Sequence, residues 1–530
     1  MPGYLQDKSF ITFRGMKLKM PVLVICVALA FFLIYSPQDK KELLPEQENN
    51  FCDQIHRNDS FNLSSELGFL KDSMASKTGV YVIEEGDVAM VSRAWLCEYA
   101  QKSIDIQYFI FSTDNVGLIA CDYIVRAADR GVKVRILVDD IMVEAGIHEI
   151  LTLDSHKNIE IKIYNPGVNL GKNIAQKIKK FAFDFRSANQ RMHNKTFTVD
   201  GNIVITGGRN IADEYFDYDH EYNFRDRDVL LMGSLCKEVS HSFEEFWEHS
   251  LSIEVTKLAD EQEQKSEDPA RFNRLHQYAC DPANFWPQVR EKINLLPNLF
   301  KTLNDSGRIV WPEKVYFVSD HPGKNDGSHG LKGGGTTTDT LASLIKHAKR
   351  TIDIQSPYLI TNAKSRELFA DAVKRGVKVR ILTNSLASTD NTEAFSGYQK
   401  CRADLLNTGV RIFEMKPDAK KRERLMTGPL QKKLNYAPVF GLHAKSMVID
   451  GETAVVGTFN LDPRSSNLNT ECITVICSEK VSAGMLKEME EEFGPDNSWE
   501  TNSDWNPDAK AGVKKQAKAI VKRVIPTKIL

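Results

Sequence analysis

One pattern of polar and small residues occurs twice in this chain of 530 residues, once in each half. The first copy comprises His193, Lys195, Asp200, Gly207, Gly208 and Asn210, and the second comprises His443, Lys445, Asp450, Gly457, Thr458 and Asn460. All spacings agree between the copies. Two histidines are what a covalent phosphoryl-transfer site needs, because one can attack phosphorus while the other protonates the leaving oxygen. The duplication therefore predicts two similar halves that share one site.

Each copy predicts a strand followed by a tight hairpin. Residues two apart on a strand point to the same face, so each histidine should lie beside its lysine. The Asp-Gly pairs at 200–201 and 450–451 stand between apolar, β-branched runs, which is a strong hairpin signal. The hairpin lets Asn210 and Asn460 return toward this face, and the small Gly208 and Thr458 let the backbone approach a ligand. Two such sets can surround one phosphate without a metal.

A second internal repeat predicts the architecture. Residues 103–107 recur at 351–355, and residues 131–137 recur at 376–382. Each pair predicts a strand, a helix and another strand, which favours a parallel or mixed sheet covered by helices. Closing helices are expected at 237–249 and 483–493. We therefore predict an α/β fold with two similar halves, each a mixed sheet flanked by helices, packed around one shared active site.

These motifs resemble the signature of the phospholipase D superfamily, which reads His-x-Lys, four residues, Asp, six residues, Gly-Gly or Gly-Thr, one residue and Asn. Further segments resemble bacterial cardiolipin synthases of the C type, namely 208–216, 384–390, 397–400 and 460–471. The resemblance covers residues 76–495 and leaves the N-terminus outside.

The resemblance implies a two-step reaction that uses neither a metal nor another cofactor. One histidine attacks a phosphodiester and becomes phosphohistidine, while the other protonates the departing alcohol and later activates an incoming alcohol or water. We assign His193 as the nucleophile and His443 as the acid and base, because the first-half histidine is more often the nucleophile in relatives; the exchanged roles stay open. The implied phosphate-binding residues are Lys195, Lys445, Asn210 and Asn460, with Gly208 and Thr458 beside them.

Four acidic residues complete the candidate site. A catalytic imidazole needs a carboxylate on its second nitrogen to fix the tautomer. The family pattern places such acids at Asp226 and Glu471, each next to an apolar strand. Asp200 and Asp450 belong to the motifs, but we expect them to brace their turns rather than to touch substrate.

The chain divides into seven expected segments. These are a cytoplasmic N-terminus (1–15), a membrane anchor or uncleaved signal (16–37), a linker (38–75), the first phospholipase D-like half (76–255), a connector (256–305), the second half (306–495) and a basic amphipathic tail (496–530). The apolar run at 20–35 is short for a membrane span, and a cleaved signal peptide is the rival interpretation. Its basic N-terminal flank predicts a catalytic domain outside the cytoplasm.

The C-terminal tail also indicates binding to a membrane. Its apolar residues, Val513, Ala517, Ile520, Val521 and Val524, follow helical spacing among lysines. A basic amphipathic helix is typical of binding to anionic lipid, and a solvated tail is the alternative. The net charge of the whole chain is only −2, so any such attraction is local. None of the nine cysteines has a metal-binding spacing, and their number leaves disulfides undecided.

The leading functional hypothesis is a membrane-bound phosphatidyltransferase that makes cardiolipin in a bacterial cell membrane, with an extracytoplasmic catalytic domain. A hydrolytic phospholipase D differs only in admitting water to the second step. A nuclease is a further alternative, but the chain lacks an overall basic balance, so no nucleic-acid partner is expected. A scaffold without activity is disfavoured by two intact motifs. The expected partners are phospholipids and the membrane, and a monomer suffices because one chain carries both motifs.

Overall fold

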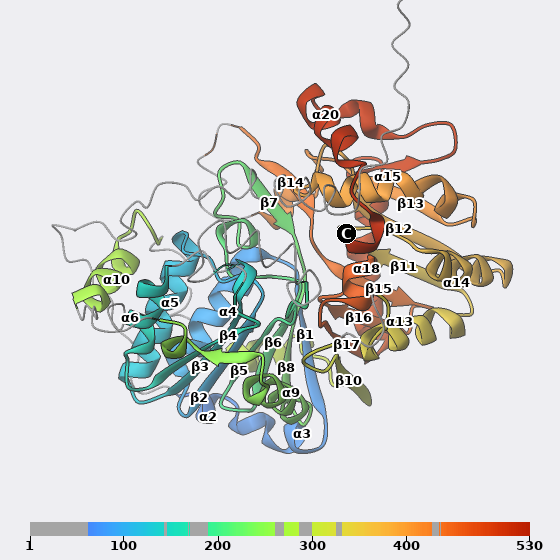
Figure 1. Cartoon of the computed structure of the whole chain (residues 1–530). Helices are drawn as coiled ribbons and strands as arrows, with labels where there is room; N and C mark the ends of the chain where they lie inside the picture. The colour runs from blue at the N-terminus through green and yellow to red at the C-terminus, as the bar shows by residue number, and fades with distance from the viewer. Residues whose placement is uncertain are drawn as a thin grey trace, which may run out of the picture.

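The computed structural model describes residues 62–142, 146–167, 169, 189–259, 270–285, 299–324, 331–426, 434 and 436–530. They form two halves that lie side by side, each built on an eight-stranded sheet (Figure 1). The segment at 16–37, where the anchor is expected, falls outside these ranges. Within them, no helix is long and apolar enough to cross a membrane.

The first sheet is mixed, as predicted. Its parallel strands are β2 (Ser103–Tyr108), β3 (Lys133–Asp139) and β4 (Ile159–Tyr164). Its antiparallel neighbours are β1 (Thr78–Ile83), β5 (Thr196–Val199), β6 (Ile203–Gly207), β8 (Asp228–Gly233) and β9 (Ser252–Glu254). The order across the sheet is β1-β8-β6-β5-β2-β3-β4-β9.

The second sheet repeats this order strand for strand, as β10-β17-β16-β15-β11-β12-β13-β18. Its parallel strands are β11 (Thr351–Gln355), β12 (Lys378–Asn384) and β13 (Arg411–Met415). The others are β10 (Lys314–Ser319), β15 (Lys445–Ile449), β16 (Thr453–Gly457), β17 (Cys472–Cys477) and β18 (Ser498–Thr501). The internal repeat in the sequence therefore extends to the order of all eight strands in each sheet. Strand β18 lies beyond residue 495, where we had expected the second half to end.

Helices flank both sheets. The longer ones are α4 (Gly86–Tyr99), α5 (Asn115–Asp129), α6 (Ile147–Asp154), α9 (Cys236–Glu248) and α10 (Ala270–Cys280) before residue 299, and α13 (Thr336–His347), α14 (Ala363–Lys374), α15 (Thr392–Leu406), α19 (Glu479–Phe493) and α20 (Val513–Lys522) after it. The crossover helices α5 and α14 begin at side-chain caps, Asp114 and Asn362. Both end before a glycine with positive φ, Gly131 and Gly376, as is typical of helix C-termini.

The remaining helices are short. They are α2 (Leu63–Glu66), α3 (Lys71–Ser76), α12 (Leu299–Asp305), α16 (Arg422–Leu425) and α18 (Pro463–Asn467).

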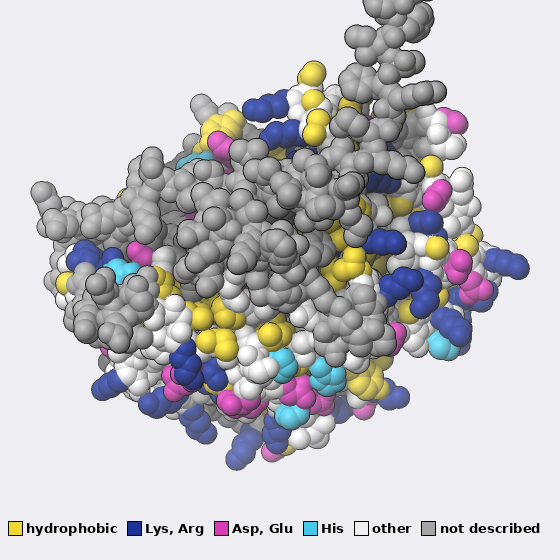
Figure 2. All heavy atoms as spheres, in the orientation of Figure 1, with side chains coloured by type: hydrophobic (Ala, Val, Ile, Leu, Met, Phe, Trp, Pro, Cys, Tyr) yellow, Lys and Arg dark blue, Asp and Glu magenta, His cyan; other side chains and the backbone are white. Residues whose placement is uncertain are grey.

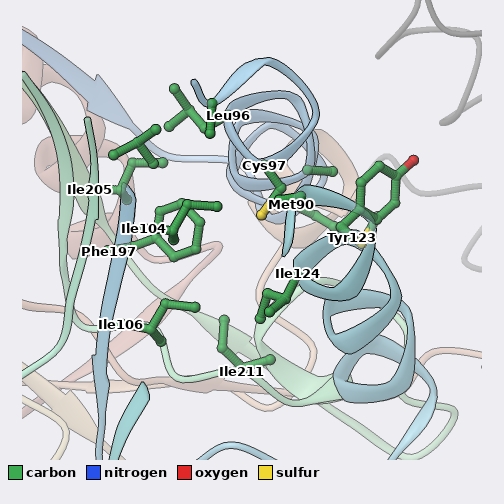
Figure 3. Close-up of a cluster of buried hydrophobic side chains, with 14 of the residues drawn as sticks. Met90, Leu96, Cys97, Ile104, Ile106, Tyr123, Ile124, Phe197, Ile205 and Ile211 are labelled. Atoms are coloured by element: carbon green, nitrogen blue, oxygen red, sulfur yellow. The ribbon is translucent and has the colours of Figure 1, made fainter. Parts of the chain in front are cut away.

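The first half has a continuous apolar core between its sheet and helices α4 and α5 (Figure 3). Ile104, Ile106 and Phe197 come from β2 and β5, and they face Met90 and Ile124 of the two helices. Full burial of one such side chain contributes about 1.5–3 kcal/mol. This packing fixes β2 and β5 against each other, and β5 carries the first motif.

The two halves meet through an apolar cluster to which both sheets contribute. Val204 and Leu231 belong to the first sheet, and Val448 and Val456 belong to the second. Above this contact, β7 (Tyr222–Arg225) pairs in parallel with β14 (Val439–Leu442), so that a two-stranded sheet joins the halves. The interface therefore has fixed register as well as apolar packing.

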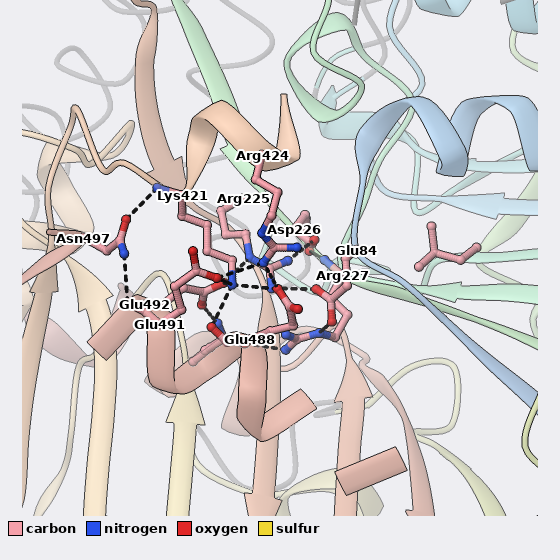
Figure 4. Close-up of polar contacts among 12 residues, drawn as sticks. Glu84, Arg225, Asp226, Arg227, Lys421, Arg424, Glu488, Glu491, Glu492 and Asn497 are labelled. Atoms are coloured by element: carbon pink, nitrogen blue, oxygen red, sulfur yellow. Dashed lines mark hydrogen bonds and ion pairs between the residues drawn. The ribbon is translucent and has the colours of Figure 1, made fainter. Parts of the chain in front are cut away.

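An ion network strengthens the interface (Figure 4). The guanidinium group of Arg225 lies 2.6 Å from both Glu84 and Glu492, and Arg227 lies 2.8 Å from Glu84. Lys421 lies close to three carboxylates of α19, including Glu492. Burial raises the pKa of Glu84, but the two arginines outweigh this effect and lower the pKa to about 2. Arg225 and Arg227 flank Asp226, so the network holds the backbone of a candidate site residue.

Candidate active site

His443 is oriented by an acid from the other half of the chain. Its Nδ1 atom lies 2.6 Å from Oδ2 of Asp226. The backbone explains the contact: β7 ends at Arg225 and β14 ends at Leu442, and these two residues are paired. The next residue on each strand is Asp226 or His443, and the backbone N–H of His443 donates to the carbonyl of Arg225 at 2.8 Å. Parallel pairing between the halves therefore places the acid beside the imidazole.

His193 is oriented in the same way, but here the histidine belongs to the first half and the acid to the second. Its Nδ1 atom lies 2.8 Å from Oε2 of Glu471. The preceding residues, Met192 and Thr470, form a parallel bridge between the halves. The backbone N–H of His193 donates to the carbonyl of Thr470 at 3.0 Å. Each histidine thus belongs to one half and takes its orienting carboxylate from the other.

These contacts define the chemistry of the imidazoles. A carboxylate on Nδ1 fixes the proton there, so Nε2 of each ring is the nitrogen that can react, although Nε2 of His443 also lies within hydrogen-bond distance of Lys445. Burial lowers the pKa of His193 to about 4 and that of His443 to about 3, with nearby ammonium groups adding to the effect and the carboxylates opposing it. The side chains still keep 9% and 6% of their solvent exposure. At neutral pH both rings are therefore neutral, the state that a nucleophile requires.

The two motif lysines lie within the same site. Nζ of Lys195 donates to the carbonyl of His193 at 2.9 Å, and Nζ of Lys445 lies 2.8 Å and 3.0 Å from the ring nitrogens of His443. Burial, together with the charge of Lys445, lowers the pKa of Lys195 to about 7. Burial lowers the pKa of Lys445 to about 8. Two ammonium groups that repel each other form a site for an anion.

The charged groups of each motif act on the histidine of the other motif. The charge of Lys445 lowers the pKa of His193, and the charge of Lys195 lowers the pKa of His443. The structure therefore brings together His193, Lys195, Asp226, His443, Lys445 and Glu471.

The two motif asparagines differ in their surroundings. Nδ2 of Asn210 donates to the hydroxyl of Tyr215 at 2.8 Å, and its Oδ1 accepts from the backbone of Ile110. Among the described residues, the buried Oδ1 of Asn460 has no hydrogen-bond partner. Within the described ranges, the side chain of Asn460 is therefore free at its Oδ1 acceptor, whereas both ends of the Asn210 amide are already held.

Gly208 and Thr458 contact the orienting acids. A Cβ atom on Gly208 would lie 2.0 Å from Oδ1 of Asp226, so only glycine fits there. The hydroxyl of Thr458 donates to the carboxylate of Glu471. Their backbone N–H groups already donate to carbonyls at 3.0 Å and 2.9 Å, so neither N–H is directed to a phosphate. In this structure both residues support the acids instead of lining the anion site.

Asp200 and Asp450 lie in the hairpin turns, at the opposite ends of β5 and β15 from the histidines. Asp200 accepts backbone hydrogen bonds from Gln101, Lys102 and Ser103. Asp450 accepts the matching set from residues 349–351. Both have positive φ, which Asp tolerates in such turns. They brace the hairpins and do not join the candidate site.

Aromatic residues that the motifs do not include pack around the histidines. The ring of Phe109 meets His193 edge to face, with centroids 5.0 Å apart. Tyr215 and Phe224 lie 5.0 Å and 4.7 Å from the ring of His443. Sequence reasoning missed these contacts and the exchange of acids between the halves. Tyr215 does lie in the segment 208–216, which already resembled the C-type synthases, so that segment carried the signal.

Two buried imidazoles, two acids and two lysines on duplicated sheets define a phospholipase D-type phosphodiester site. Residues 96–247 and 341–494, together more than half of the chain, match the family described as "Cardiolipin synthase, PLD-like domain". The chain belongs to this family and is an enzyme of the phospholipase D superfamily.

Individual relatives support this membership. The chain is 32% identical to cardiolipin synthase C of Escherichia coli (strain K12) over 417 residues, which cover 76% of this chain and 82% of the relative. An uncharacterized protein of Helicobacter pylori (strain ATCC 700392 / 26695) is 33% identical over 390 residues, or 74% of each chain. The crystal structure of phosphatidylserine synthase from Haemophilus influenzae Rd KW20 shares the fold, with a TM-score of 0.55 at 12% identity over 87% of this chain and all of that one.

Proposed function

We propose that the protein is a membrane-associated phosphatidyltransferase that works through a phosphohistidine on His193. In the first step, Nε2 of His193 attacks the phosphorus of a phospholipid, and the bond from phosphorus to the headgroup oxygen breaks. His443 gives its Nε2 proton to that oxygen, so the headgroup leaves as a neutral alcohol. The exchanged acids carry this proposal, because each holds Nδ1 of its histidine and so makes Nε2 the reacting nitrogen.

In the second step, His443 accepts the proton of an incoming alcohol. The alcohol oxygen attacks phosphorus, the bond to His193 breaks, and a new phosphodiester is released. His443 must be protonated for the first step, although its pKa is low in the empty site. A bound phosphodiester brings a negative charge beside the ring, and this charge favours the protonated form. The substrate itself thus prepares the acid.

Lys195 and Lys445 hold the non-bridging oxygens and stabilise the charge that grows on them in the transition state. Fixed donors of this kind contribute more in a site that excludes water than they do in solution. The Nδ2 amide of Asn460 is a further proposed donor, because the amide of Asn210 is already held by Tyr215 and Ile110.

Relatives support a phospholipid substrate and an alcohol acceptor. The E. coli relative is a cardiolipin synthase, and another relative, cardiolipin synthase 1 of Bacillus anthracis, is 24% identical over 83% of this chain. We therefore propose that a glycerol hydroxyl of a second phospholipid is the acceptor and that cardiolipin is the product. Water in place of this alcohol would give phosphatidic acid.

One assay tests the proposed reaction. Purified protein is incubated with EDTA and, in separate reactions, with phosphatidylglycerol, phosphatidylethanolamine or plasmid DNA, and the products are identified by mass spectrometry. Cardiolipin supports the proposal. Phosphatidic acid alone would make the enzyme a hydrolase, nicked DNA a nuclease, and the absence of any product would overturn the assignment.

We further propose that helix α20 binds the membrane surface. Ala519 is buried where α20 packs on α15, and Lys515 and Lys522 on the same side of the helix reach the carbonyl of Ala387 and the carboxylate of Glu393. The other side carries large exposed apolar residues, namely Val513 (82%), Val521 (70%) and Ile520 (60%), and the exposed Val524 (67%) follows the end of the helix. Basic and apolar side chains lie together over α20 (Figure 2). This arrangement matches insertion into an anionic lipid surface.

Vesicle flotation tests this contact. The double substitution Val513→Asp and Val521→Asp should abolish binding to vesicles of phosphatidylglycerol and phosphatidylcholine, while Tyr316→Asp, at an exposed residue of β10, is the control. Equal binding by the α20 variant would refute the proposed contact.

We propose that the catalytic domain lies outside the cytoplasm of a bacterial cell membrane. Cys280 is disulfide-bonded, and such bonds persist in oxidising compartments. Labelling of intact spheroplasts with a membrane-impermeant reagent tests this placement, because only an extracytoplasmic domain reacts.

A further inference from the structure

A polar pair outside the motifs lies at the edge of the second sheet where Lys445 begins β15. Tyr358 follows β11, and Asp390 follows β12. These strands are parallel, so the loops after them meet at one edge of the sheet. Strand β15 runs antiparallel to β11, and therefore its first residue, Lys445, lies at the same edge. The sequence of segment 384–390 resembles the C-type synthases, but this segment lies outside the catalytic motifs.

The contacts of this pair connect it to the catalytic residues. The hydroxyl of Tyr358 donates to Oδ2 of Asp390 at 2.7 Å. Enclosure by protein raises the pKa of Asp390, while Tyr358 and the ammonium groups of Lys445 and Lys515 oppose the rise. The Asp390 side chain is nevertheless exposed to solvent. The carboxyl group is thus both accessible to a ligand and within electrostatic range of the lysine beside His443.

The internal repeat provides a comparison for this feature. Gln107 and Gln355 occupy matching positions at the ends of β2 and β11. Three residues further along, the first half has Ile110 where the second has Tyr358. The ring of Phe109 covers His193, whereas Tyr358 and Asp390 place a further phenol and a carboxyl group on the side of His443.

The polar groups on the side of His443 fit the part that this histidine plays in the proposed reaction. On the side of His443, an alcohol leaves in the first step and enters in the second. A carboxyl group accepts hydrogen bonds from hydroxyl groups, so one next to the phosphate site can hold an acceptor by its hydroxyl groups. A polyol acceptor has further hydroxyl groups besides the one that reacts, and such a subsite can hydrogen-bond to them.

We propose that Asp390 and Tyr358 bind the free hydroxyl groups of a polyol acceptor and so favour transfer over hydrolysis. This inference rests on the proposed function and assigns the acceptor side of the same site. The position also fits a lipid acceptor, because Lys515 of α20 donates to the carbonyl of Ala387 in the loop that carries Asp390. A headgroup at the membrane surface that α20 contacts would enter beside this pair.

A competition between soluble acceptors tests the proposal. Wild-type enzyme, Asp390→Asn and Tyr358→Phe each receive phosphatidylglycerol in mixed micelles, with equal concentrations of glycerol, 1-propanol and ethanolamine. The ratio of phosphatidylglycerol re-formed from labelled glycerol to phosphatidylpropanol is measured, together with phosphatidic acid. We expect this ratio to fall about tenfold in Asp390→Asn, with a smaller fall in Tyr358→Phe and a larger share of phosphatidic acid. Asp129→Asn, at an exposed carboxylate of the first half, is the control.

The outcomes separate the inference from the proposed function. A wild-type enzyme that forms none of these products overturns the proposed function itself. An active wild type whose glycerol-to-propanol ratio is unchanged in both variants overturns the acceptor role. Equal losses of all products also overturn it, because the pair would then support the fold alone. A preference for ethanolamine that Asp390→Asn abolishes would assign the subsite to an amine instead of a polyol.

Discussion

Nδ1 of His193 lies 2.8 Å from Oε2 of Glu471, although 278 residues separate them in the chain. The matching contact between His443 and Asp226 spans 217 residues, and it also joins a histidine of one half to an acid of the other. Neither half can therefore orient its own histidine. The two halves must be assembled for either imidazole to be held in a reactive tautomer.

Loss of an orienting acid should impair catalysis without loss of the fold. We expect Asp226→Asn and Glu471→Gln each to lower kcat about 100-fold or more, because the amide no longer holds the imidazole as the required tautomer. Steady-state release of phosphatidic acid or cardiolipin measures the loss.

Asp200→Asn is the matched control for these variants, because its carboxylate braces a hairpin away from the site. It should lower the thermal midpoint while kcat stays close to that of the wild type. If Asp200→Asn lost as much activity as Asp226→Asn, the separation between bracing and orienting acids would be wrong.

Binding of phosphodiesters should weaken as the pH rises. The pKa values of Lys195 and Lys445 are lowered to about 7 and about 8, so their positive charges are present below these values and are lost above them. Dimethyl phosphate keeps one negative charge throughout this range, and its Kd, measured by calorimetry, should increase between pH 6.5 and 9.

Lys195→Arg provides the control for this pH dependence. Arginine stays protonated, so the first part of the increase, near pH 7, should disappear. A Kd independent of pH in the wild-type enzyme would show that these lysines do not bind the phosphate.

Removal of one member of the ion network between the halves should destabilise their interface. Arg225→Met leaves the buried Glu492 without its partner, and loss of one member of a buried ion pair costs about 3–5 kcal/mol. The urea midpoint should fall accordingly. Arg411→Met removes an exposed pair with Glu500 and should change the midpoint far less. Equal shifts in both variants would contradict this assignment.

Much of the fold could be predicted because it is encoded locally. The Asp-Gly turns predicted the hairpins β5–β6 and β15–β16, and the repeated segments at 131–137 and 376–382 became strands β3 and β12. The motif spacing also selected His193 and His443. These patterns depend on residues within a few turns of chain, so one sequence is enough to reveal them.

The rest depends on how the halves pack. The pairing of β7 with β14 decides which acid serves which histidine, and no local spacing reports that register. Strand β18 completes the second sheet from within the expected tail for the same reason. Gly208 and Thr458 fit the motif as phosphate ligands, yet they contact Asp226 and Glu471, because the acids of the apposed strands reach them first.

The roles of the two histidines can be tested by trapping the covalent intermediate. A phosphatidyl ester of p-nitrophenol needs no acid to release its leaving group, so His443→Ala should still form the phosphoenzyme but be unable to activate an acceptor. Mass spectrometry of the quenched protein should then find the phosphatidyl group on His193, and His193→Ala should carry none. Label on His443 or on any other residue, or normal turnover by His193→Ala, would contradict the account.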